Sequence, residues 1–334
     1  MTTSDRIGWG IVGLGRIAET EIAPAVTAAP NSRLAGVVSR TAAKAEEFAG
    51  RHGAAAAYDD YRALLDDPSV DAVYIATPNA LHADQVVAAA EAGKHVLCDK
   101  PLATTVADAE RAVAACETAG VRLGITFQTR NHEGMRDIRD LLAAGGIGSV
   151  RLVQVELGTG RKLPQGWRTD PALAGVGVMH NLAVHAYDLL RFLLGAEVVE
   201  ATAVVDVEPG FSVDTLALAL LRFDNGALAY VNANQVLPDT QQDLSVHGTE
   251  GSVIGRKVTR PNLTGSISVT GREGSSERSV SSAGAFVTTI GDFADAVLEG
   301  REPSPSGLDG LRSVELIDAL ALSARERRSV RLGS

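Results

Sequence analysis

The stretch Ile7-Gly8-Trp9-Gly10-Ile11-Val12-Gly13-Leu14-Gly15-Arg16-Ile17-Ala18 decides the fold of the first part of the chain. Its apolar start predicts a buried strand, and the G-x-G-x-x-A pattern leads into a helix-forming segment. In this context Gly13 permits a tight turn, Gly15 lets the backbone approach a pyrophosphate, and Ala18 lets the helix pack on the strand. Free N–H groups at the helix N-terminus bind anions. The pattern favours a dinucleotide site over an ordinary glycine turn, and the same turn contains Leu14, Arg16 and Ile17.

Short apolar runs alternate with amphipathic ones over the first 126 residues. Strands are expected at residues 7–12, 33–38, 54–58, 71–76, 95–98 and 121–126, with helices at 41–51, 81–92 and 106–119. Regular β-α-β alternation with short connections predicts a doubly wound parallel sheet with right-handed crossovers. Residues 1–126 are therefore expected to form an α/β dinucleotide-binding Rossmann domain.

The pattern changes from residue 127 onward, where strands predominate. Strands are expected at residues 150–157, 198–207, 216–223, 228–235 and 244–247, and helices at 132–144, 181–194, 286–298 and 308–325. Asp224-Asn225-Gly226 is a strong hairpin signal between two of these strands. The serine- and glycine-rich segment 264–284 is expected to be a mobile loop. Residues 127–334 are thus predicted to form an α+β domain with a mixed or antiparallel sheet and helices on one face.

Composition limits the function classes. A length of 334 residues fits two domains, and 45% hydrophobic with 22% charged residues is typical of a globular protein. A formal net charge of −10 argues against binding to nucleic acid or to an acidic membrane surface. Cys98 and Cys116 are the only cysteines, which fits a reducing compartment. With no secretory pattern and no apolar run of transmembrane length, we expect a cytoplasmic protein.

Val37-Val38-Ser39-Arg40-Thr41 ends the second expected strand. An acidic residue at this point binds the ribose diol of NAD in many dinucleotide-binding domains. Here Ser39 and Arg40 stand instead, and a hydroxyl and a guanidinium suit a 2′-phosphate. The sequence therefore favours NADP(H), with NAD(H) as the alternative if Arg40 is only a solvated loop charge.

Two further stretches follow strands that end at the same edge of the parallel sheet, where ligands bind in open α/β folds. Thr77-Pro78-Asn79, with His82 in the next helix, is a candidate cofactor-binding segment. The alternatives are that Pro78 only starts the helix and that His82 is an exposed helix residue. The second stretch is Asp99-Lys100-Pro101.

Lys100 is the candidate electrophilic group. The chain has five lysines against 26 arginines, so it rarely uses lysine for general solubility. A compact ammonium at a strand end can hydrogen-bond a substrate oxygen and polarise a carbonyl group. The alternative is a surface lysine before a helix.

The segment from Gly175 to Asp188 supplies the candidate proton carrier. Asn181, His185 and Asp188 have helical spacing on one face, so Asn181 and Asp188 can orient the imidazole. His180 points to another face, and no metal site is expected. Trp167-Arg168, in the loop before this helix, is either a cap over a planar nicotinamide or a packing anchor.

These motifs resemble those of the family of glucose-fructose oxidoreductase, inositol dehydrogenase and rhizopine-catabolism oxidoreductases (Gfo/Idh/MocA). The resemblance covers nearly the whole chain, from Gly13–Ala18 through Ala92–Pro101 to Gly175–Asp188 and the later hairpins. The family's Glu-Lys-Pro reads Asp99-Lys100-Pro101 here. Its glycine-rich D-x-x-x-H-x-x-D pattern has Val176 at the middle glycine and Asn181 at the first aspartate, while His185 and Asp188 are retained.

The resemblance implies a Rossmann domain followed by an open-faced sheet domain through which subunits associate as a homodimer or homotetramer. It implies hydride transfer between nicotinamide and a carbon bearing a hydroxyl or carbonyl group of a sugar, cyclitol, related polyol or ketone. Lys100 would orient the substrate and nicotinamide, and His185 would exchange the hydroxyl proton, with Asn181 in the catalytic set. Positions that line the nicotinamide pocket in the family correspond to Gln128, Trp167 and Arg168.

Two other functions remain open from sequence. Some relatives use the same fold as non-catalytic regulators that bind dinucleotide or sugar, and others are glycosidases with tightly bound NAD. Retention of both Lys100 and His185 favours the oxidoreductase, because a regulator would not need the pair.

Overall fold

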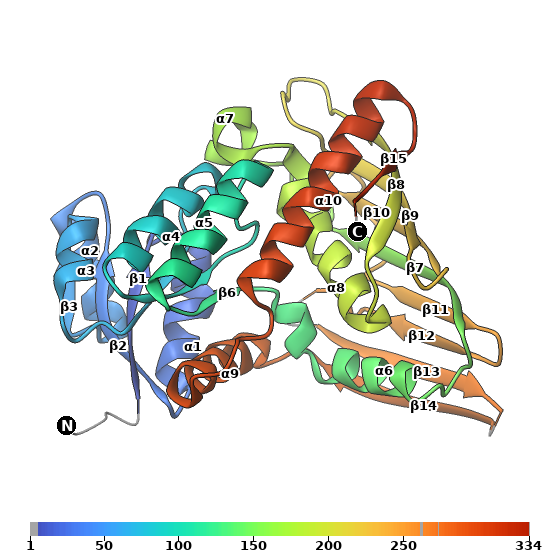
Figure 1. The fold of residues 1–334 in the computed structure, drawn as a ribbon, viewed down its shortest axis with the longest axis horizontal. Coiled ribbons are helices and arrows are strands. Elements are labelled where there is room, and N and C mark those ends of the chain that lie inside the picture. The colour runs from blue at the N-terminus through green and yellow to red at the C-terminus, as the bar shows by residue number, and fades with distance from the viewer. Residues whose placement is uncertain (1–5, 261–262, 273, 334) are drawn as a thin grey trace. The chain divides into compact units, whose positions relative to one another are not determined.

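The computed structural model describes residues 6–260, 263–272 and 274–333, which divide into two compact units. Unit 1 contains the chain up to Thr126 together with Phe286–Leu311. Unit 2 contains Phe127–Ala285 and the chain from Arg312 onward. Figure 1 labels most of the helices and strands.

Unit 1 is built on a six-stranded sheet in the order β3-β2-β1-β4-β5-β6, and every neighbouring pair is parallel. Its strands are β1 (Ile7–Val12), β2 (Ser32–Val38), β3 (Ala56–Tyr58), β4 (Ala72–Ile75), β5 (His95–Cys98) and β6 (Leu123–Ile125). Strand β1 is buried along its whole length, as expected for a central parallel strand covered on both faces. The predicted doubly wound parallel sheet is confirmed, and its order reverses between β1 and β4.

Helical segments connect these strands. They are η1 (Ala18–Ile22, a π-helical turn), α1 (Ala23–Ala28), α2 (Ala42–His52), α3 (Tyr61–Asp66), η2 (Asn79–Leu81), α4 (His82–Glu91) and α5 (Val106–Ala119). Gly120 ends α5 in the left-handed conformation that favours glycine. The sequence pattern does not predict α3, a six-residue helix capped by the carboxylate of Asp60.

Residues 286–311 belong to unit 1, whereas the sequence pattern predicts them in the second domain. They contain most of α9 (Ala285–Glu299) and the start of α10 (Gly307–Glu326). The Phe293 ring packs on Trp9 of β1 with ring centroids 5.5 Å apart. The Asn31 amide donates to the Gly291 carbonyl oxygen at 2.9 Å and to the Asp295 carboxylate at 2.6 Å. The apolar face of α9 is thus buried on the Rossmann sheet, which periodicity alone does not reveal.

Unit 2 is built on a nine-stranded sheet in the order β14-β13-β12-β11-β7-β10-β9-β8-β15. Its strands are β7 (Val150–Gly158), β8 (Val198–Asp206), β9 (Leu216–Phe223), β10 (Leu228–Asn234), β11 (Leu244–Gly248), β12 (Ser252–Arg256), β13 (Thr264–Gly271), β14 (Gly274–Ser281) and β15 (Val330–Arg331). The β7–β10 pair is parallel and the other pairs are antiparallel, so the sheet is mixed as expected.

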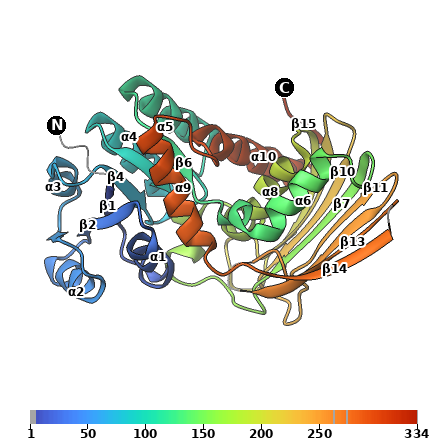
Figure 2. The same ribbon diagram turned by 90° about the horizontal axis from the view of Figure 1, so that it is seen from below.

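Helices cover one face of this sheet. The helical segments of unit 2 before α10 are η3 (Gln128–Asn131), α6 (Glu133–Ala143), η4 (Gly166–Thr169), α7 (Pro171–Ala174), η5 (Met179–Ala183, a π-helical turn) and α8 (Val184–Leu194). Helices α6 and α8 lie against the same face of the sheet (Figure 2). Alternating residues of β9 follow this division, with Ala217, Ala219 and Leu221 buried and Leu220 59% exposed.

The prediction of a mobile loop at residues 264–284 is wrong, because this segment contains two strands. Strands β13 and β14 pair in antiparallel register from Thr264 opposite Ser281 to Gly271 opposite Gly274. The Arg278 guanidinium also binds the carboxylates of Asp137 and Glu133 on α6. Backbone pairing satisfies the polar groups of this segment, in which β13 has a short apolar alternation at Ile267 and Val269 and β14 has none.

Candidate active site

Glycine is required for different reasons at positions 13 and 15. Gly13 has a φ of +90°, and a Cβ there would lie 2.8 Å from the Ala76 carbonyl, so the fold itself requires glycine. A Cβ at Gly15 would have no described atom within 4 Å, and its φ is not positive. Nothing within the described chain therefore excludes a side chain at Gly15. The open space fits a ligand that approaches the backbone closely.

The turn is positioned as a dinucleotide would need it. It follows β1 at the carboxyl edge of the sheet, beside the point where the strand order reverses. Leu14 is buried in the hydrophobic core of unit 1, and Ile17 is half-buried, whereas Gly15 and Arg16 are exposed. No side chain caps η1 at Ile17, although the Glu19 N–H donates to the Gly15 carbonyl oxygen at 3.0 Å, and an uncapped helical start of this kind suits a phosphate.

Ser39 and Arg40 follow β2 at the same edge. Ser39 is half-buried and its backbone N–H donates to the Tyr58 carbonyl oxygen at 3.1 Å. The Arg40 side chain is exposed, and within the described residues it forms no ion pair. No carboxylate occupies the position after β2 where a ribose diol would be recognised.

His82 supports the site from within the fold. It is 1% exposed, and its Nδ1 and Nε2 lie 2.7 Å and 2.9 Å from the carbonyl oxygens of Pro101 and Thr77. Burial lowers the pKa of the His82 imidazole. The ring joins the loop after β4 to the loop after β5, and direct contact of His82 with cofactor stays a prediction. The alternative of an exposed helix residue is wrong.

Thr77, Pro78 and Asn79 lie in the loop between β4 and α4. The Thr77 hydroxyl donates to the Gln85 side chain at 2.5 Å, Pro78 is half-buried, and Asn79 is 5% exposed at the start of η2. They remain candidates for cofactor contact through this loop.

Lys100 lies two residues after β5, in the loop held by His82. The Asp99 backbone N–H donates to the Ile75 carbonyl oxygen at 2.9 Å, which extends the pairing of β5 with β4. The Asp99 carboxylate accepts from the Lys100 backbone N–H at 2.9 Å. Asp99 therefore orders the backbone that presents the half-buried Lys100 side chain at the carboxyl edge of the sheet.

In unit 2, Asp214 holds the start of the helical segment that carries Asn181 and His185. Its carbonyl oxygen accepts from the Val178 N–H at 2.8 Å, and its carboxylate accepts from the Met179 N–H at 3.1 Å. Gly177 passes so close that a Cβ would lie 2.1 Å from the Asp214 carbonyl oxygen. Burial raises the pKa of the Asp214 carboxyl to about 7.

Asn181 and His185 lie on the accessible side of this segment, and both are half-buried. Asn181 lies in η5, whose π-helical hydrogen bonding interrupts the predicted regular helix. Single π turns are rare in proteins as a whole, and those that occur are often found at functional sites. The His180 Nδ1 accepts from the Val176 N–H at 3.1 Å, so that histidine organises the preceding loop.

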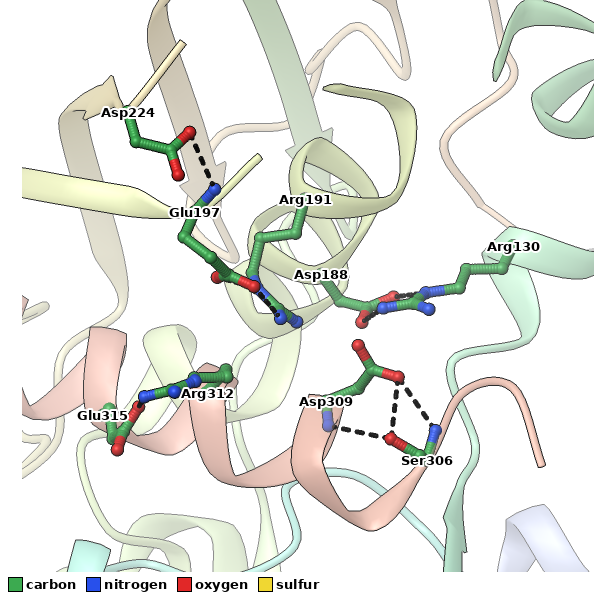
Figure 3. A network of polar contacts seen from close by, with 9 residues as sticks. All are labelled: Arg130, Asp188, Arg191, Glu197, Asp224, Ser306, Asp309, Arg312 and Glu315. Carbon is green, nitrogen blue, oxygen red and sulfur yellow. Dashed lines mark hydrogen bonds and ion pairs between the residues drawn. The ribbon is translucent and has the colours of Figure 1, made fainter. Parts of the chain in front are cut away.

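Asp188 lies on the buried side of α8. Both of its carboxylate oxygens accept hydrogen bonds from the Arg130 guanidinium, from Nε at 2.8 Å and from Nη2 at 2.5 Å (Figure 3). That Asp188 also helps to orient the His185 ring stays a prediction. The ring of Phe127 meets the His185 ring edge-on, with centroids 6.3 Å apart and planes at 82°.

The remaining candidates of unit 2 lie in two short helical turns. Gln128 is 6% exposed at the start of η3. Trp167 and Arg168 lie in η4 and are half-buried, and the Arg168 guanidinium stacks on the Trp167 ring at 4.2 Å. A flat, partly accessible pair of this kind can cover a planar ring.

Sequence reasoning missed Arg130 and Asp214. Each acts on the His185 segment from a distant part of the chain, and neither stands in a recognisable local motif. For Asp214 the available signal was an acidic residue two positions before the apolar strand β9, where a carboxylate is unusual unless it has a partner.

Comparison with known proteins supports a dinucleotide site in unit 1. Residues 7–127 match the family described as an oxidoreductase family with an NAD-binding Rossmann fold, and residues 135–254 match the Gfo/Idh/MocA C-terminal domain. Together the two matches cover more than half of the chain.

Individual relatives agree along the whole length. A 1,5-anhydro-D-fructose reductase of Ensifer adhaerens is 35% identical over 92% of this chain and 92% of its own length. A D-xylose 1-dehydrogenase (NADP(+)) of Haloferax volcanii is 34% identical over 97% and 99%. The crystal structure of aldose-aldose oxidoreductase from Caulobacter crescentus, complexed with glycerol, has a TM-score of 0.91 and 32% identity, covering 98% of this chain and 100% of that one.

Proposed function

This chain belongs to the Gfo/Idh/MocA oxidoreductase family, and we propose that it uses Lys100 and His185 to oxidise or reduce an unphosphorylated sugar or polyol with NADP(H). That it is an NAD(P)-dependent oxidoreductase acting on CH–OH or C=O carbons of sugars, cyclitols or related polyols follows from the family and its named members. The observation that best supports a cofactor in this chain is the open space at Gly15.

The proposed roles follow from side-chain chemistry. When bound, the nicotinamide ring would accept or deliver a hydride at the substrate carbon. The Lys100 ammonium stabilises negative charge on the substrate oxygen, because a preorganised cation is most effective where charge develops. The His185 imidazole exchanges the hydroxyl proton as general acid or base.

Asn181 distinguishes this chain from the family pattern. Its amide can hold the substrate hydroxyl but cannot attract the imidazolium as a carboxylate does. We therefore assign Asn181 to substrate positioning, one turn before His185.

The preference for NADP(H) rests on the end of β2. Arg40 is exposed and Ser39 supplies a hydroxyl beside it, while no carboxylate is present to repel a 2′-phosphate. Gly13–Ile17 and the loop Thr77–Asn79 would hold the rest of the dinucleotide. Gln128, Trp167 and Arg168 would line the nicotinamide.

The substrate class rests on the relatives. The names of three of them specify anhydrofructose, xylose and aldoses, none of them phosphorylated, and the name of a fourth specifies a dTDP-linked sugar. We transfer to this chain only the common chemistry, a polyhydroxylated carbon chain or ring with one reacting CH–OH or C=O.

A second copy of the chain is the proposed partner. The face of the nine-stranded sheet opposite α6 and α8 exposes Val204 by 65%, Leu220 by 59% and Leu228 by 41%, on the adjacent strands β8, β9 and β10. Contiguous apolar surface of this kind marks an interaction site. A homodimer or homotetramer would bury it, and Leu220→Glu should dissociate the oligomer in analytical ultracentrifugation.

The state of the two cysteines is consistent with a reducing compartment. Cys98 and Cys116 are buried and unbonded. No helix among the described residues is long and apolar enough to cross a membrane. We propose the cytoplasm as the location.

The function is tested by following nicotinamide absorbance with a panel of aldoses, cyclitols, anhydrosugars and their keto forms. Turnover with at least one of these compounds is expected with NADPH or NADP⁺. Absence of turnover across the panel, with cofactor bound, would contradict the proposed substrate class.

A further inference from the structure

Arg130 and Asp188 form an ion pair with almost no access to solvent. Their side chains are 8% and 1% exposed, and two parallel hydrogen bonds join them. In Figure 3 the guanidinium lies edge-on to the carboxylate, as a bidentate pair requires. This geometry fixes both the distance and the angle between the two side chains.

Arg130 also contacts α8 one turn further along. Its guanidinium carbon lies 5.3 Å from the centroid of the Phe192 ring, four residues after Asp188. Arg139 of α6 lies over the same ring at 4.9 Å. Two successive turns of α8 are therefore held by one side chain of η3.

The pair joins two elements that carry site candidates. Gln128 lies two residues before Arg130 in η3, and His185 lies three residues before Asp188 in α8. Phe127, directly before η3, packs edge-on against the His185 ring. A shift of η3 along α8 would therefore move the aromatic ring that contacts the imidazole.

Stability alone does not account for a pair buried in this way. Desolvation of two charges costs about as much as their attraction returns, and apolar side chains of similar volume are often equally stable. What a bidentate buried pair provides is a fixed arrangement of the elements that it connects.

We propose that Arg130 and Asp188 are positioning residues for His185: they fix η3 on α8 so that the imidazole keeps one orientation, without touching substrate or cofactor. This inference rests on the proton-transfer role of His185 proposed above. It assigns to Arg130 a part in catalysis that no local motif indicates.

The main test variant carries Arg130→Met and Asp188→Leu together. It removes both charges and keeps the interior filled, so its thermal midpoint should equal or exceed that of the parent. We expect kcat to fall roughly 10- to 100-fold, because small displacements of a catalytic group have effects of this size. Cofactor affinity should stay at the parent value.

Arg130→Lys separates the effect of charge from the effect of geometry. It is also the test variant to use if the double variant does not fold. Lysine keeps a positive charge opposite Asp188 but cannot form two parallel hydrogen bonds or stack flat on Phe192. A loss of kcat in this variant is expected, whereas parent kcat would show that charge alone suffices and would overturn the proposal.

Arg191 and Glu197 provide a matched control. They form a second bidentate pair on α8, with distances of 2.7 Å and 2.6 Å, but Glu197 is 50% exposed and lies outside η3 (Figure 3). Arg191→Met with Glu197→Leu should leave kcat within about twofold of the parent. An equal loss in this control would mean that any change on α8 lowers activity, and the specific role would be wrong.

Two readouts complete the test. In the double variant kcat should fall by the same factor at every pH, since a change in the apparent pKa of the pH profile would instead indicate that Asp188 acts on His185 by charge. The ring signals of isotope-labelled His185 should broaden or multiply. Unchanged signals would overturn the proposal even if the parent proved inactive on every sugar, so failure of the inference is distinguishable from failure of the proposed function.

Discussion

The backbone N–H of Met179 donates to the Asp214 carboxylate at 3.1 Å, and this bond starts the π turn that precedes His185. Asp214 is 7% exposed, and the buried hydroxyl of Tyr187 lies near enough to interact with its charge. Because burial raises the pKa of Asp214 from 3.8 to about 7, the carboxyl keeps its proton in the folded protein under conditions in which the unfolded chain has released it.

This relationship predicts how stability depends on pH. The contribution of protonated Asp214 is present below about pH 4 and is lost as the pH rises to about 7. A shift of this size corresponds to a decrease of about 4 kcal/mol in the free energy of unfolding. Asp214→Asn keeps an oxygen for the Met179 N–H and should remove this pH-dependent part in urea titrations. The exposed Asp59, changed to Asn, is the control; equal slopes in parent and Asp214→Asn would contradict the account.

Gly15 should matter for cofactor and not for folding. A Cβ at this exposed position would meet no described atom within 4 Å, so Gly15→Leu should have the thermal midpoint of the parent but no measurable NADPH or NADH affinity. Gly50→Leu, at another glycine with open space, should bind cofactor normally. Gly13→Ala should instead lose about 1 kcal/mol or more of stability, because its positive φ and the Ala76 carbonyl exclude a Cβ. Normal titration of Gly15→Leu would rule out this turn as the pyrophosphate site.

Arg40 should determine the choice of cofactor. A charge-assisted hydrogen bond to a 2′-phosphate contributes about 1.5–3 kcal/mol, so Arg40→Ala should weaken NADPH binding roughly 10- to 100-fold and leave NADH unchanged. Lys44→Ala, which removes another exposed cation of the neighbouring helix, controls for general charge. The dissociation constants come from fluorescence titration. Tighter binding of NADH than of NADPH by the parent would refute the preference.

Replacement of the proposed catalytic side chains should separate chemistry from binding. His185→Ala should reduce turnover about 10²- to 10⁴-fold, the range typical of general acid–base catalysis, with little change in cofactor affinity. Lys100→Ala should be at least as damaging. Asn181→Asp should keep activity and raise it in the oxidative direction, since a carboxylate favours proton uptake by His185. Near-parent turnover in both the His185 and Lys100 variants would support a binding role for the protein instead.

Much of unit 1 follows from sequence because its signals are local. Strand β1 is a continuous apolar run, and the turn after it has a recognisable glycine pattern, so both are predicted with their residues. Strand β14 is missed for the opposite reason, because its residues are almost all exposed and show no apolar alternation. The burial of His82 depends on the loop at Pro101, which only the fold brings to it.

The same distinction applies to the candidate site. Gly15, Lys100, Asn181 and His185 stand in short motifs whose chemistry can be interpreted residue by residue. The Arg130–Asp188 pair joins positions 58 residues apart, and no pattern in either segment specifies the other. The π turn at Met179–Ala183 depends on Asp214, which lies beyond the next strand of the chain.

Hydride transfer itself can be measured directly. The protein is incubated with NADPH carrying deuterium at the nicotinamide C4 and with the keto sugar that gives the highest turnover, and the alcohol product is analysed by mass spectrometry. The account predicts deuterium on the reacting carbon of the product. It also predicts that the deuterated product forms more slowly in the Lys100→Ala and His185→Ala variants. A product without deuterium, formed at the parent rate while cofactor is bound, would contradict it.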